Sequence, residues 1–252
     1  MTEKNPTILF ACLALIVAIG SWALNPIEAG SLSFADQFSF WNIPNGKNTL
    51  SCISLIILGI YGLTCRPRFD LGREVLVSLA LACVSSVFLG AFAIWHHIDP
   101  YLLSRWAVHL ALALCIMNAG FALVIIQLPI KSPWWLFVVC QLIAIFNASF
   151  EYVYDDRRFL LMSQTLLALL VLFSIIRLWR LSSAKLLSYS LALFLLAFVS
   201  NFFDQKILQG SAYMISGHSL QHLLWSFAGF FLLRFLIIIK PSDLNTYPTE
   251  IE

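Results

Sequence analysis

Residues 75–95 read VLVSLALACVSSVFLGAFAIW, and no position in this stretch carries a charged side chain. An α-helix of this length is about 30 Å long, because each residue adds about 1.5 Å along the helix axis. The hydrocarbon core of a bilayer has the same thickness, about 30 Å. The stretch therefore predicts a membrane-spanning helix.

The composition of the whole chain agrees with that interpretation. Of its 252 residues, 60% are hydrophobic and 11% are charged, and the mean hydropathy is +0.87. A water-soluble domain has about a quarter charged residues, so this chain has too little polar surface to cover a soluble globule. The net charge of +2 and the lack of a basic stripe interleaved with aromatic residues argue against nucleic acid as a partner. We expect the partner to be the lipid bilayer.

Eight apolar stretches, separated by short polar joints, are long enough to cross a membrane as helices. The alternation of apolar and polar residues that a transmembrane β-barrel needs is absent throughout. The sequence therefore predicts an all-α fold, a polytopic helical bundle in the membrane. The predicted spans are 7–24, 49–64, 75–95, 106–128, 134–150, 159–176, 186–203 and 218–239.

The first stretch has a second interpretation, a cleavable signal peptide. Lys4 precedes it, and the small residues Ala29 and Gly30 follow it. However, the apolar run is longer than a typical signal-peptide core and has no clean A-x-A cleavage site. We therefore favour a retained N-terminal helix that acts as a signal anchor.

The distribution of Lys and Arg in the joints predicts the orientation of the chain, because cytoplasmic loops are enriched in these residues. With the N-terminus in the cytoplasm, nine of them fall on the cytoplasmic side and five on the outer side. We therefore expect both termini in the cytoplasm. The joint that follows Glu151 and contains Asp155 and Asp156 then faces outward.

The five histidines all fall at the predicted outer face. His96 and His97 end the third predicted helix, His109 lies about one turn into the fourth, and His218 and His222 open the eighth. The i, i+4 spacing of His218 and His222 puts both rings on one helix face, close enough to share a metal ion. Zinc accepts neutral imidazole, and catalytic zinc sites use three protein ligands and one water. His96 or His97 could supply the third ligand.

The histidines, cysteines and asparagines of the spans also allow simpler roles. Interfacial histidines can hydrogen-bond to headgroups or water, and imidazoles also bind haem iron, although an i, i+4 pair fits haem poorly. The cysteines form no CxxC pair and nearly all lie in apolar runs, so we expect buried thiols without a disulfide or a cysteine metal site. Asn118, Asn147 and Asn201 are expected to hydrogen-bond between helices.

Several segments resemble bacterial members of the alkaline ceramidase family, which belongs to a wider group of seven-helix membrane hydrolases that includes the progestin and adipoQ receptors. The most specific is SGHSLQHLL at 216–224. The others are FADQ at 34–37, NIPNGKNTLS at 42–51, DDRRFLLMSQ at 155–164 and FDQKI at 203–207. The resemblance covers roughly residues 34–239 and implies three parts: an N-terminal helix within 1–33, a seven-helix core over 34–240, and a cytoplasmic tail at 241–252.

The same resemblance implies a zinc ion held by His218, His222 and one of His96 and His97, with His97 slightly favoured by its distance to Pro100. It implies a hydrolase that cleaves a ceramide-like lipid amide with a zinc-activated water, in a bacterial inner membrane. Each metal-bound ring is expected to find an acceptor for its second nitrogen, because bound imidazoles are normally oriented in this way. Asp99 and Asn118 are the candidates.

The chain departs from the family pattern at two positions. The family has a serine four residues before its first zinc-binding histidine, where this chain has Phe92 or Ala93, and an aspartate about eleven residues after it, where this chain has Ala107 and Val108. The nearest substitutes as catalytic residues are Asp99 and His109. The departures keep a second hypothesis open, a non-catalytic seven-helix zinc-binding protein of the pseudoenzyme or receptor type.

Overall fold

The computed structural model describes residues 26–27, 35, 38–65, 72–127 and 133–239. Within these ranges the chain forms helices and no β-strand, and the closest approach to a strand is an isolated bridge between Phe40 and Ile43. The prediction of an all-α bundle is confirmed.

Seven helical segments are long and apolar enough to cross a membrane, which fits a multi-pass membrane protein. The first segment consists of two consecutive helices, and a short helix, α9, connects the last two segments. In chain order the helices are α2 (Gly46–Ser51), α3 (Ile53–Thr64), α4 (Arg73–Ile98), α5 (Leu102–Gln127), α6 (Trp134–Tyr154), α7 (Arg158–Leu178), α8 (Ala184–Phe202), α9 (Asp204–Gly210) and α10 (Gly217–Ile238). The predicted span 7–24 and the tail 241–252 lie outside the described residues, and the orientation in the membrane remains a prediction.

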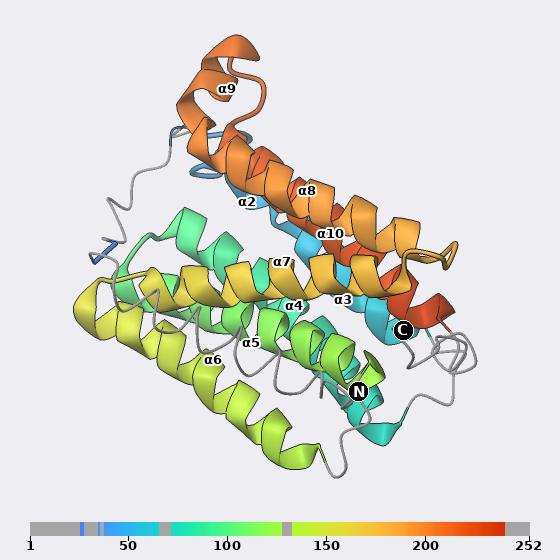
Figure 1. Ribbon diagram of the computed structural model, residues 1–252. Helices are drawn as coiled ribbons and strands as arrows, with labels where there is room; N and C mark the ends of the chain where they lie inside the picture. Colours follow the sequence, from blue (N-terminus) through green and yellow to red (C-terminus); the bar gives the residue numbers. More distant parts are fainter. Residues whose placement is uncertain (1–25, 28–34, 36–37, 66–71, 128–132, 240–252) are drawn as a thin grey trace, which may run out of the picture.

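Six of the seven segments form a closed ring. Around the ring α3 packs against α4, α4 against α5, α5 against α7, α7 against α8, α8 against α10, and α10 again against α3. Helix α6 stands outside the ring and packs on α5 and α7 (Figure 1). This arrangement encloses the space along the ring axis, where the candidate site lies.

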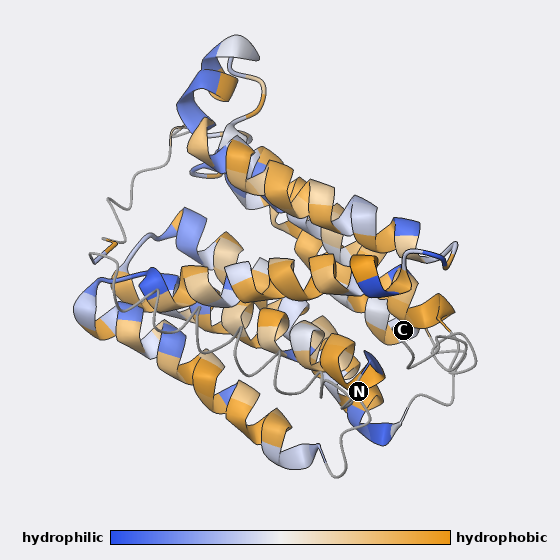
Figure 2. Cartoon of the chain, viewed as in Figure 1, coloured by the Kyte–Doolittle hydropathy of each residue, from blue (hydrophilic) through white to orange (hydrophobic). Residues whose placement is uncertain are grey.

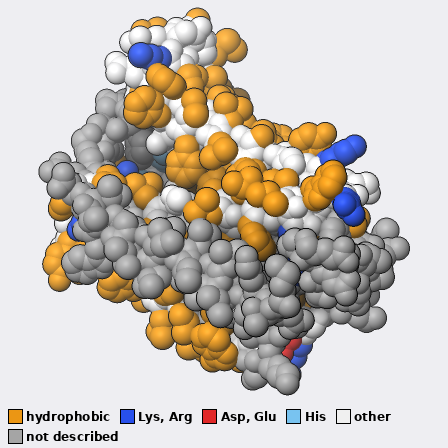
Figure 3. Space-filling view, viewed as in Figure 1, with side chains coloured by type: hydrophobic (Ala, Val, Ile, Leu, Met, Phe, Trp, Pro, Cys, Tyr) orange, Lys and Arg blue, Asp and Glu red, His pale blue; other side chains and the backbone are white. Residues whose placement is uncertain are grey.

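The outer surface of the bundle is apolar. Helix α6 exposes a stripe formed by Trp135, Val138, Leu142 and Phe146, each at least half exposed. Figure 2 shows the same hydrophobic character along the other long helices, with hydrophilic residues concentrated near helix ends and in α9. Hydrophobic side chains also cover most of the described surface visible in Figure 3. A surface of this kind suits contact with lipid, because soluble proteins rarely expose apolar patches of this extent.

Small residues let α3 approach α4 closely. A Cβ atom added to Gly90 of α4 would lie 2.8 Å from the carbonyl oxygen of Cys52. The Ser86 hydroxyl donates to the carbonyl oxygen of Leu55 at 2.8 Å, and the hydroxyls of Ser54 and Ser226 lie 2.7 Å apart between α3 and α10. Small and weakly polar residues are the usual means of helix association in membranes. Here they hold the start of α3 beside α4 and α10.

Three local differences from the predicted spans concern the end of the bundle that contains the histidines. The predicted span 49–64 is interrupted at Cys52, between α2 and α3. Helix α5 begins at Leu102, so Arg105 lies inside it, where its side chain pairs with the buried Glu151 and with Asp155. Helix α9 was not predicted, since its sequence is too short and polar to form a span.

The prediction that asparagines inside spans bond between helices is confirmed. Asn118 of α5 and Gln141 of α6 exchange two amide hydrogen bonds of 3.3 and 3.1 Å. Asn147 of α6 donates to the Ser163 hydroxyl of α7. Asn201, near the end of α8, contacts a histidine of α10, as described next.

Candidate metal centre

The candidate centre lies where α4 ends and α10 begins. Asp204, the first residue of α9, accepts the backbone N–H of His218 at 2.7 Å, and Ser216 caps α10 by accepting the N–H of Ser219 at 3.0 Å. Asn48 of α2 accepts hydrogen bonds from the hydroxyls of Ser216 and Ser219, at 3.0 and 2.6 Å. These contacts fix the first turn of α10 against α2 and α9, and therefore fix the position of its histidines.

Three imidazole rings converge at this point. The ring centre of His97 lies 5.2 Å from that of His218 and 5.4 Å from that of His222, and the latter two are 4.6 Å apart. Three imidazoles on one tetrahedral zinc, with bonds of about 2.0–2.1 Å, have ring centres about 5 Å apart. The structure thus brings the rings of three of the four predicted ligands together, and of the adjacent pair it is His97 that faces α10. The group whose ligand atoms lie within 4.8 Å of one another contains His97 and His222 but not His218.

A cysteine belongs to the same buried cluster. The Sγ atom of Cys52 and one ring nitrogen each of His97 and His222 lie within 4.8 Å of one another. Cys52 thus lies where a metal ligand could lie, in contrast to the expectation of thiols without a metal role, and the described cysteines are free thiols. Imidazole and thiol are ligands suited to zinc, copper or iron and unsuited to magnesium or calcium. The donor set fits a transition-metal ion.

The hydrogen bonds of His222 define which of its nitrogens can bind a metal. Its Nδ1 lies 2.8 Å from the Ser51 hydroxyl, and this hydroxyl donates to the carbonyl oxygen of Asn48 at 2.7 Å. A serine hydroxyl has a single hydrogen, so Ser51 accepts a hydrogen bond from Nδ1–H of His222. The Nε2 atom then keeps the lone pair that a metal needs.

His218 follows the same rule. Its Nδ1 lies 3.0 Å from Oδ1 of Asn201, and an amide oxygen can only accept, so Nδ1 carries the hydrogen and Nε2 the lone pair. His96, in contrast, contacts the Ser104 hydroxyl at 2.8 Å, at the joint between α4 and α5, and its ring centre is 6.1 Å from that of His97. Nδ1 of His96 is therefore engaged by the joint between α4 and α5, and His96 does not belong to the group whose ligand atoms lie within 4.8 Å.

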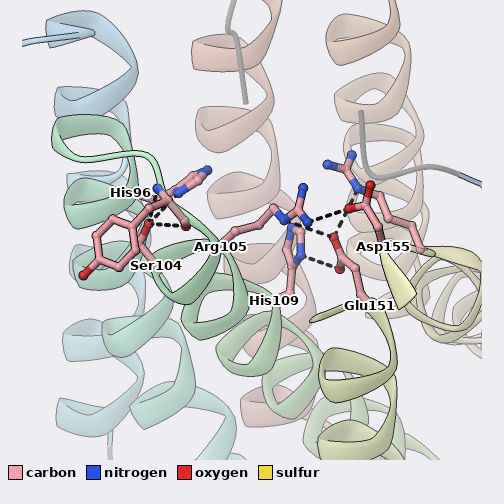
Figure 4. A network of polar contacts seen from close by, with 8 residues as sticks. His96, Ser104, Arg105, His109, Glu151 and Asp155 are labelled. Carbon is pink, nitrogen blue, oxygen red and sulfur yellow. Dashed lines mark hydrogen bonds and ion pairs between the residues drawn. The ribbon is translucent and has the colours of Figure 1, made fainter. Parts of the chain in front are cut away.

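A charged network stands across from the cluster. His109 of α5 contacts Glu151 of α6 at 2.5 Å, and Arg105 contacts Asp155 at 2.6 Å (Figure 4). Glu151 also lies 3.9 Å from Arg105 and 3.3 Å from Arg157. The Glu151 side chain is only 2% exposed. One buried carboxylate thus compensates two arginines and orients one histidine.

Both groups face one cavity of about 460 Å³, and all five histidines line it. A second cavity of about 130 Å³ continues along the ring axis and is almost entirely apolar. The two cavities share five lining residues, which mark the junction: Leu55, Leu89, Leu112, Gln164 and Trp225. The site therefore combines a polar chamber at the end of the bundle with an apolar extension inside it.

The remaining predicted residues lie elsewhere. Asp99 is exposed at the end of α4 and is not among the residues that line the cavity, whereas His109 lines it. The expectation that Asp99 and Asn118 orient the metal-binding rings is wrong for His222 and His218, which contact Ser51 and Asn201. For the ring of His97 it stays a prediction. Asn118 pairs with Gln141, away from the cluster.

Sequence reasoning missed Ser51, Cys52, Glu151, Arg105 and Arg157 as parts of the site. One available signal was their position: each lies near a span end at the predicted outer face, as the histidines do. Pairing polar residues by membrane face and depth would have grouped Arg105, His109 and Glu151.

No protein-family model matches this chain, and a search of curated proteins gives no match. The class of protein therefore follows from the fold and the site alone. The chain is an all-α, multi-pass membrane protein with a buried cysteine–histidine cluster that could bind a metal ion.

Proposed function

We propose that this protein is a zinc-dependent integral-membrane hydrolase that cleaves an acyl amide bond of a membrane lipid. The observation that carries the proposal is the pair of oriented rings, His218 and His222, beside His97: each has Nδ1 engaged by a neutral partner, which leaves the lone pair on Nε2. Zinc bound by these residues would polarise a carbonyl and supply hydroxide near neutral pH. The resemblance to alkaline ceramidases supports the same chemistry and a bacterial inner membrane.

The third ligand has two candidates. His218 completes the ligand set that the resemblance implies, and Cys52 completes the group whose donor atoms lie within 4.8 Å. We assign the position to His218, because the Sγ atom of Cys52 lies 3.3 Å from Nδ1 of His222, the nitrogen that Ser51 already engages. Cys52 also donates to the carbonyl oxygen of Asn48 at 3.1 Å, which suits a protonated thiol.

The apolar cavity supports a lipid substrate. An acyl chain placed along the ring axis would put its carbonyl group at the junction of the two cavities. There, Nε1 of Trp225 and Oε1 of Gln164 are buried and have no hydrogen-bond partner among the described residues. Buried polar atoms of this kind are costly unless a partner is supplied. The Trp225 N–H suits the substrate carbonyl, and the Gln164 oxygen suits an amide N–H, which an ester lacks.

His109 is the proton carrier in this proposal. Glu151 accepts from its Nδ1, so Nε2 can take a proton from water and pass it to the leaving amine. This role replaces the serine and aspartate that the family pattern has and this chain lacks. Asp99, which is exposed and does not line the cavity, is given no role.

The test is metal analysis of the purified protein followed by measurement of fatty acid release from N-acyl lipids, ceramide included. We expect about one zinc per chain, because the site offers one group of ligands, and release of fatty acid that stops on chelation. The His109→Ala variant should retain zinc and lose turnover. Protein that contains zinc and hydrolyses no N-acyl lipid would contradict the proposal.

The second candidate is a non-catalytic zinc-binding membrane protein, and the family positions now occupied by Ala93 and Ala107 favour it. Ala93 lines the cavity and lies four residues, about one helical turn, before His97 in α4. If the second candidate is correct, the unmodified protein releases no fatty acid, and the double variant Ala93→Ser with Ala107→Asp should release it. An active parent excludes this candidate.

A further inference from the structure

Two arginines line the polar cavity, and the carboxylates that pair with them do not. Arg105 and Arg157 are among the lining residues, whereas Glu151 and Asp155 are not. The carboxylates therefore lie behind the arginines as seen from the cavity. Arg105 is nearly buried, with 8% of its side chain exposed, so it cannot be explained as a surface residue that reaches for solvent or lipid headgroups.

The two guanidinium groups retain donor capacity. The ion pairs engage Nε and Nη2 of Arg105 and Nε of Arg157. Each guanidinium has five N–H donors, arranged in a fork that matches a carboxylate or a phosphate. Two such forks at one cavity wall form a binding surface for an anion.

Among the described residues a single carboxylate lines the cavity, and it is already engaged. Asp204 lines the cavity, but its Oδ1 accepts the backbone N–H of His218 and its Oδ2 accepts that of Ala35. The charge that faces an incoming ligand is therefore positive on the arginine side. Charge complementarity discriminates between ligands, and more strongly where the charged group is buried, as Arg105 is.

We propose that the site takes an acyl amide whose head group carries a carboxylate, that is, an N-acyl amino acid, with Arg105 and Arg157 binding the carboxylate. This inference rests on the proposed hydrolase function and narrows its substrate class, since ceramide has a neutral head group. The acyl chain occupies the apolar cavity, and the amide lies at the junction between the cavities. Water adds across the C–N bond: oxygen joins the acyl carbon, the amine nitrogen takes a proton, and a fatty acid and an amino acid are released.

The test compares two amides with the same acyl chain, N-oleoylglycine and N-oleoylethanolamine, which differ in the carboxylate. Binding is measured by calorimetry with the purified protein in neutral detergent, with metal present and with metal removed. We expect the glycine conjugate to bind about tenfold more tightly or better, because charge-assisted bidentate pairs are the strong ones. The Arg157→Gln variant should reduce this preference to about twofold or less.

Arg158→Gln is the matched control. Arg158 follows directly in sequence, pairs with Asp156 at 2.7 Å and is not among the cavity-lining residues. The Arg158→Gln variant should prefer the glycine conjugate over the ethanolamine conjugate as strongly as the parent protein does. Arg105→Gln is a second test if it folds, and Arg157, which is 36% exposed, tolerates the change more easily. Equal affinity of the parent for both amides, or a preference that survives in Arg157→Gln, would overturn the inference.

Two further measurements separate the inference from the proposed function. Displacement of the conjugate by inorganic phosphate or glycine at the same concentration would mean that the site takes a free anion, and would overturn the lipid assignment. Release of oleate from both amides at equal rates with equal affinity would overturn the inference and leave the hydrolase function standing. Preferential binding of the glycine conjugate without any oleate release would support the anion site and contradict the hydrolase.

Discussion

The two walls of the polar cavity handle buried polar groups in opposite ways. On the α4–α10 wall, the rings of His218 and His222 are oriented by the neutral partners Asn201 and Ser51. On the α5–α6–α7 wall, charged groups compensate one another around Glu151. The first wall keeps imidazole lone pairs available, and the second balances its charges behind the cavity while Arg105 and Arg157 line it.

The difference has a physical reason. A buried charge without a partner is expensive, so the arginines require Glu151 and Asp155 close by. On the histidine wall, neutral acceptors orient Nδ1–H of His218 and His222 and leave the lone pair on Nε2, without adding a charge to the buried site. Neutral partners on one wall and a self-compensated network on the other therefore let a metal site and a charged site share one cavity.

The largest expected effect comes from removing the metal-binding wall. The double substitution His97→Ala and His222→Ala should reduce bound zinc from about one per chain to near zero and lower fatty acid release by about 10³-fold or more. Mass spectrometry of metals and the release assay measure the two effects. His96→Ala is the control, because His96 is buried beside His97 but contacts Ser104. Equal loss of zinc in the control would refute the assignment of the adjacent pair.

Substitutions in the charged wall should lower the free energy of unfolding of the protein. Glu151→Ala leaves Arg105, Arg157 and His109 without their shared buried carboxylate, so we expect a cost of about 3–5 kcal/mol in the free energy of unfolding. Asp155→Ala removes a partner that is 59% exposed, and should cost about 1 kcal/mol or less. Thermal unfolding in detergent compares the two variants. Similar costs for both would show that the buried network is not centred on Glu151.

The sequence predicts the histidine wall better than it predicts the charged wall. The seven described spans followed from apolar length, and the meeting of His218 and His222 with one of His96 and His97 followed from counting which span ends share a membrane face. The choice of His97 did not follow from that count. The charged wall did not follow, because a sequence does not reveal that Glu151 is close enough to Arg105 to keep it inside α5. Patterns predict depth and face, but pairing depends on how helices rotate against each other.

The same limit explains the wrong assignment of orienting residues. Asp99 was close in sequence to His97 but is exposed, while Ser51 and Asn201 are distant in sequence and adjacent in space. Cys52 was judged by its apolar surroundings, and its position depends on the close approach of α3 to Gly90. Contacts made possible by a missing side chain leave no periodic signal in the sequence.

A smaller effect is expected from the packing that positions the metal-binding wall. A Cβ atom added at Gly217 would lie 2.0 Å from the carbonyl oxygen of Ser200 and 2.6 Å from the Cα atom of Asp204. Gly217→Ala must therefore displace α10 from α8 and α9, at a cost of about 1–3 kcal/mol. The control is Gly210→Ala, where a Cβ atom would meet nothing within 4 Å. If Gly217→Ala is as stable as this control and binds as much zinc, the close contact does not position His218.

The smallest effect concerns Asp156, at the joint beside the charged wall. Its Oδ1 accepts the backbone N–H groups of Arg158 and Ile27 at 3.0 and 3.2 Å, and its Oδ2 accepts from Nε of Arg158 at 2.7 Å. Burial alone would raise the pKa of Asp156, but these hydrogen bonds and the Arg158 charge outweigh it and hold the pKa below its usual range. A lowered folded-state pKa means that the carboxylate stabilises the fold above the unfolded-state pKa of about 3.9, and that this contribution is lost as the pH falls through the folded-state value.

Asp156→Asn should therefore cost about 1 kcal/mol at neutral pH, and the difference from the parent should shrink as the pH is lowered through the acidic range. Unfolding in detergent, followed as a function of pH, measures this difference. Asn keeps one acceptor oxygen for the backbone N–H groups of Arg158 and Ile27, but its NH2 group cannot accept from Nε of Arg158, so the variant removes the charge together with that one hydrogen bond. A cost that stays constant down to acidic pH would mean that the joint depends on hydrogen-bond geometry alone. The charged wall would then end at Glu151, Asp155 and their arginine and histidine partners, without Asp156.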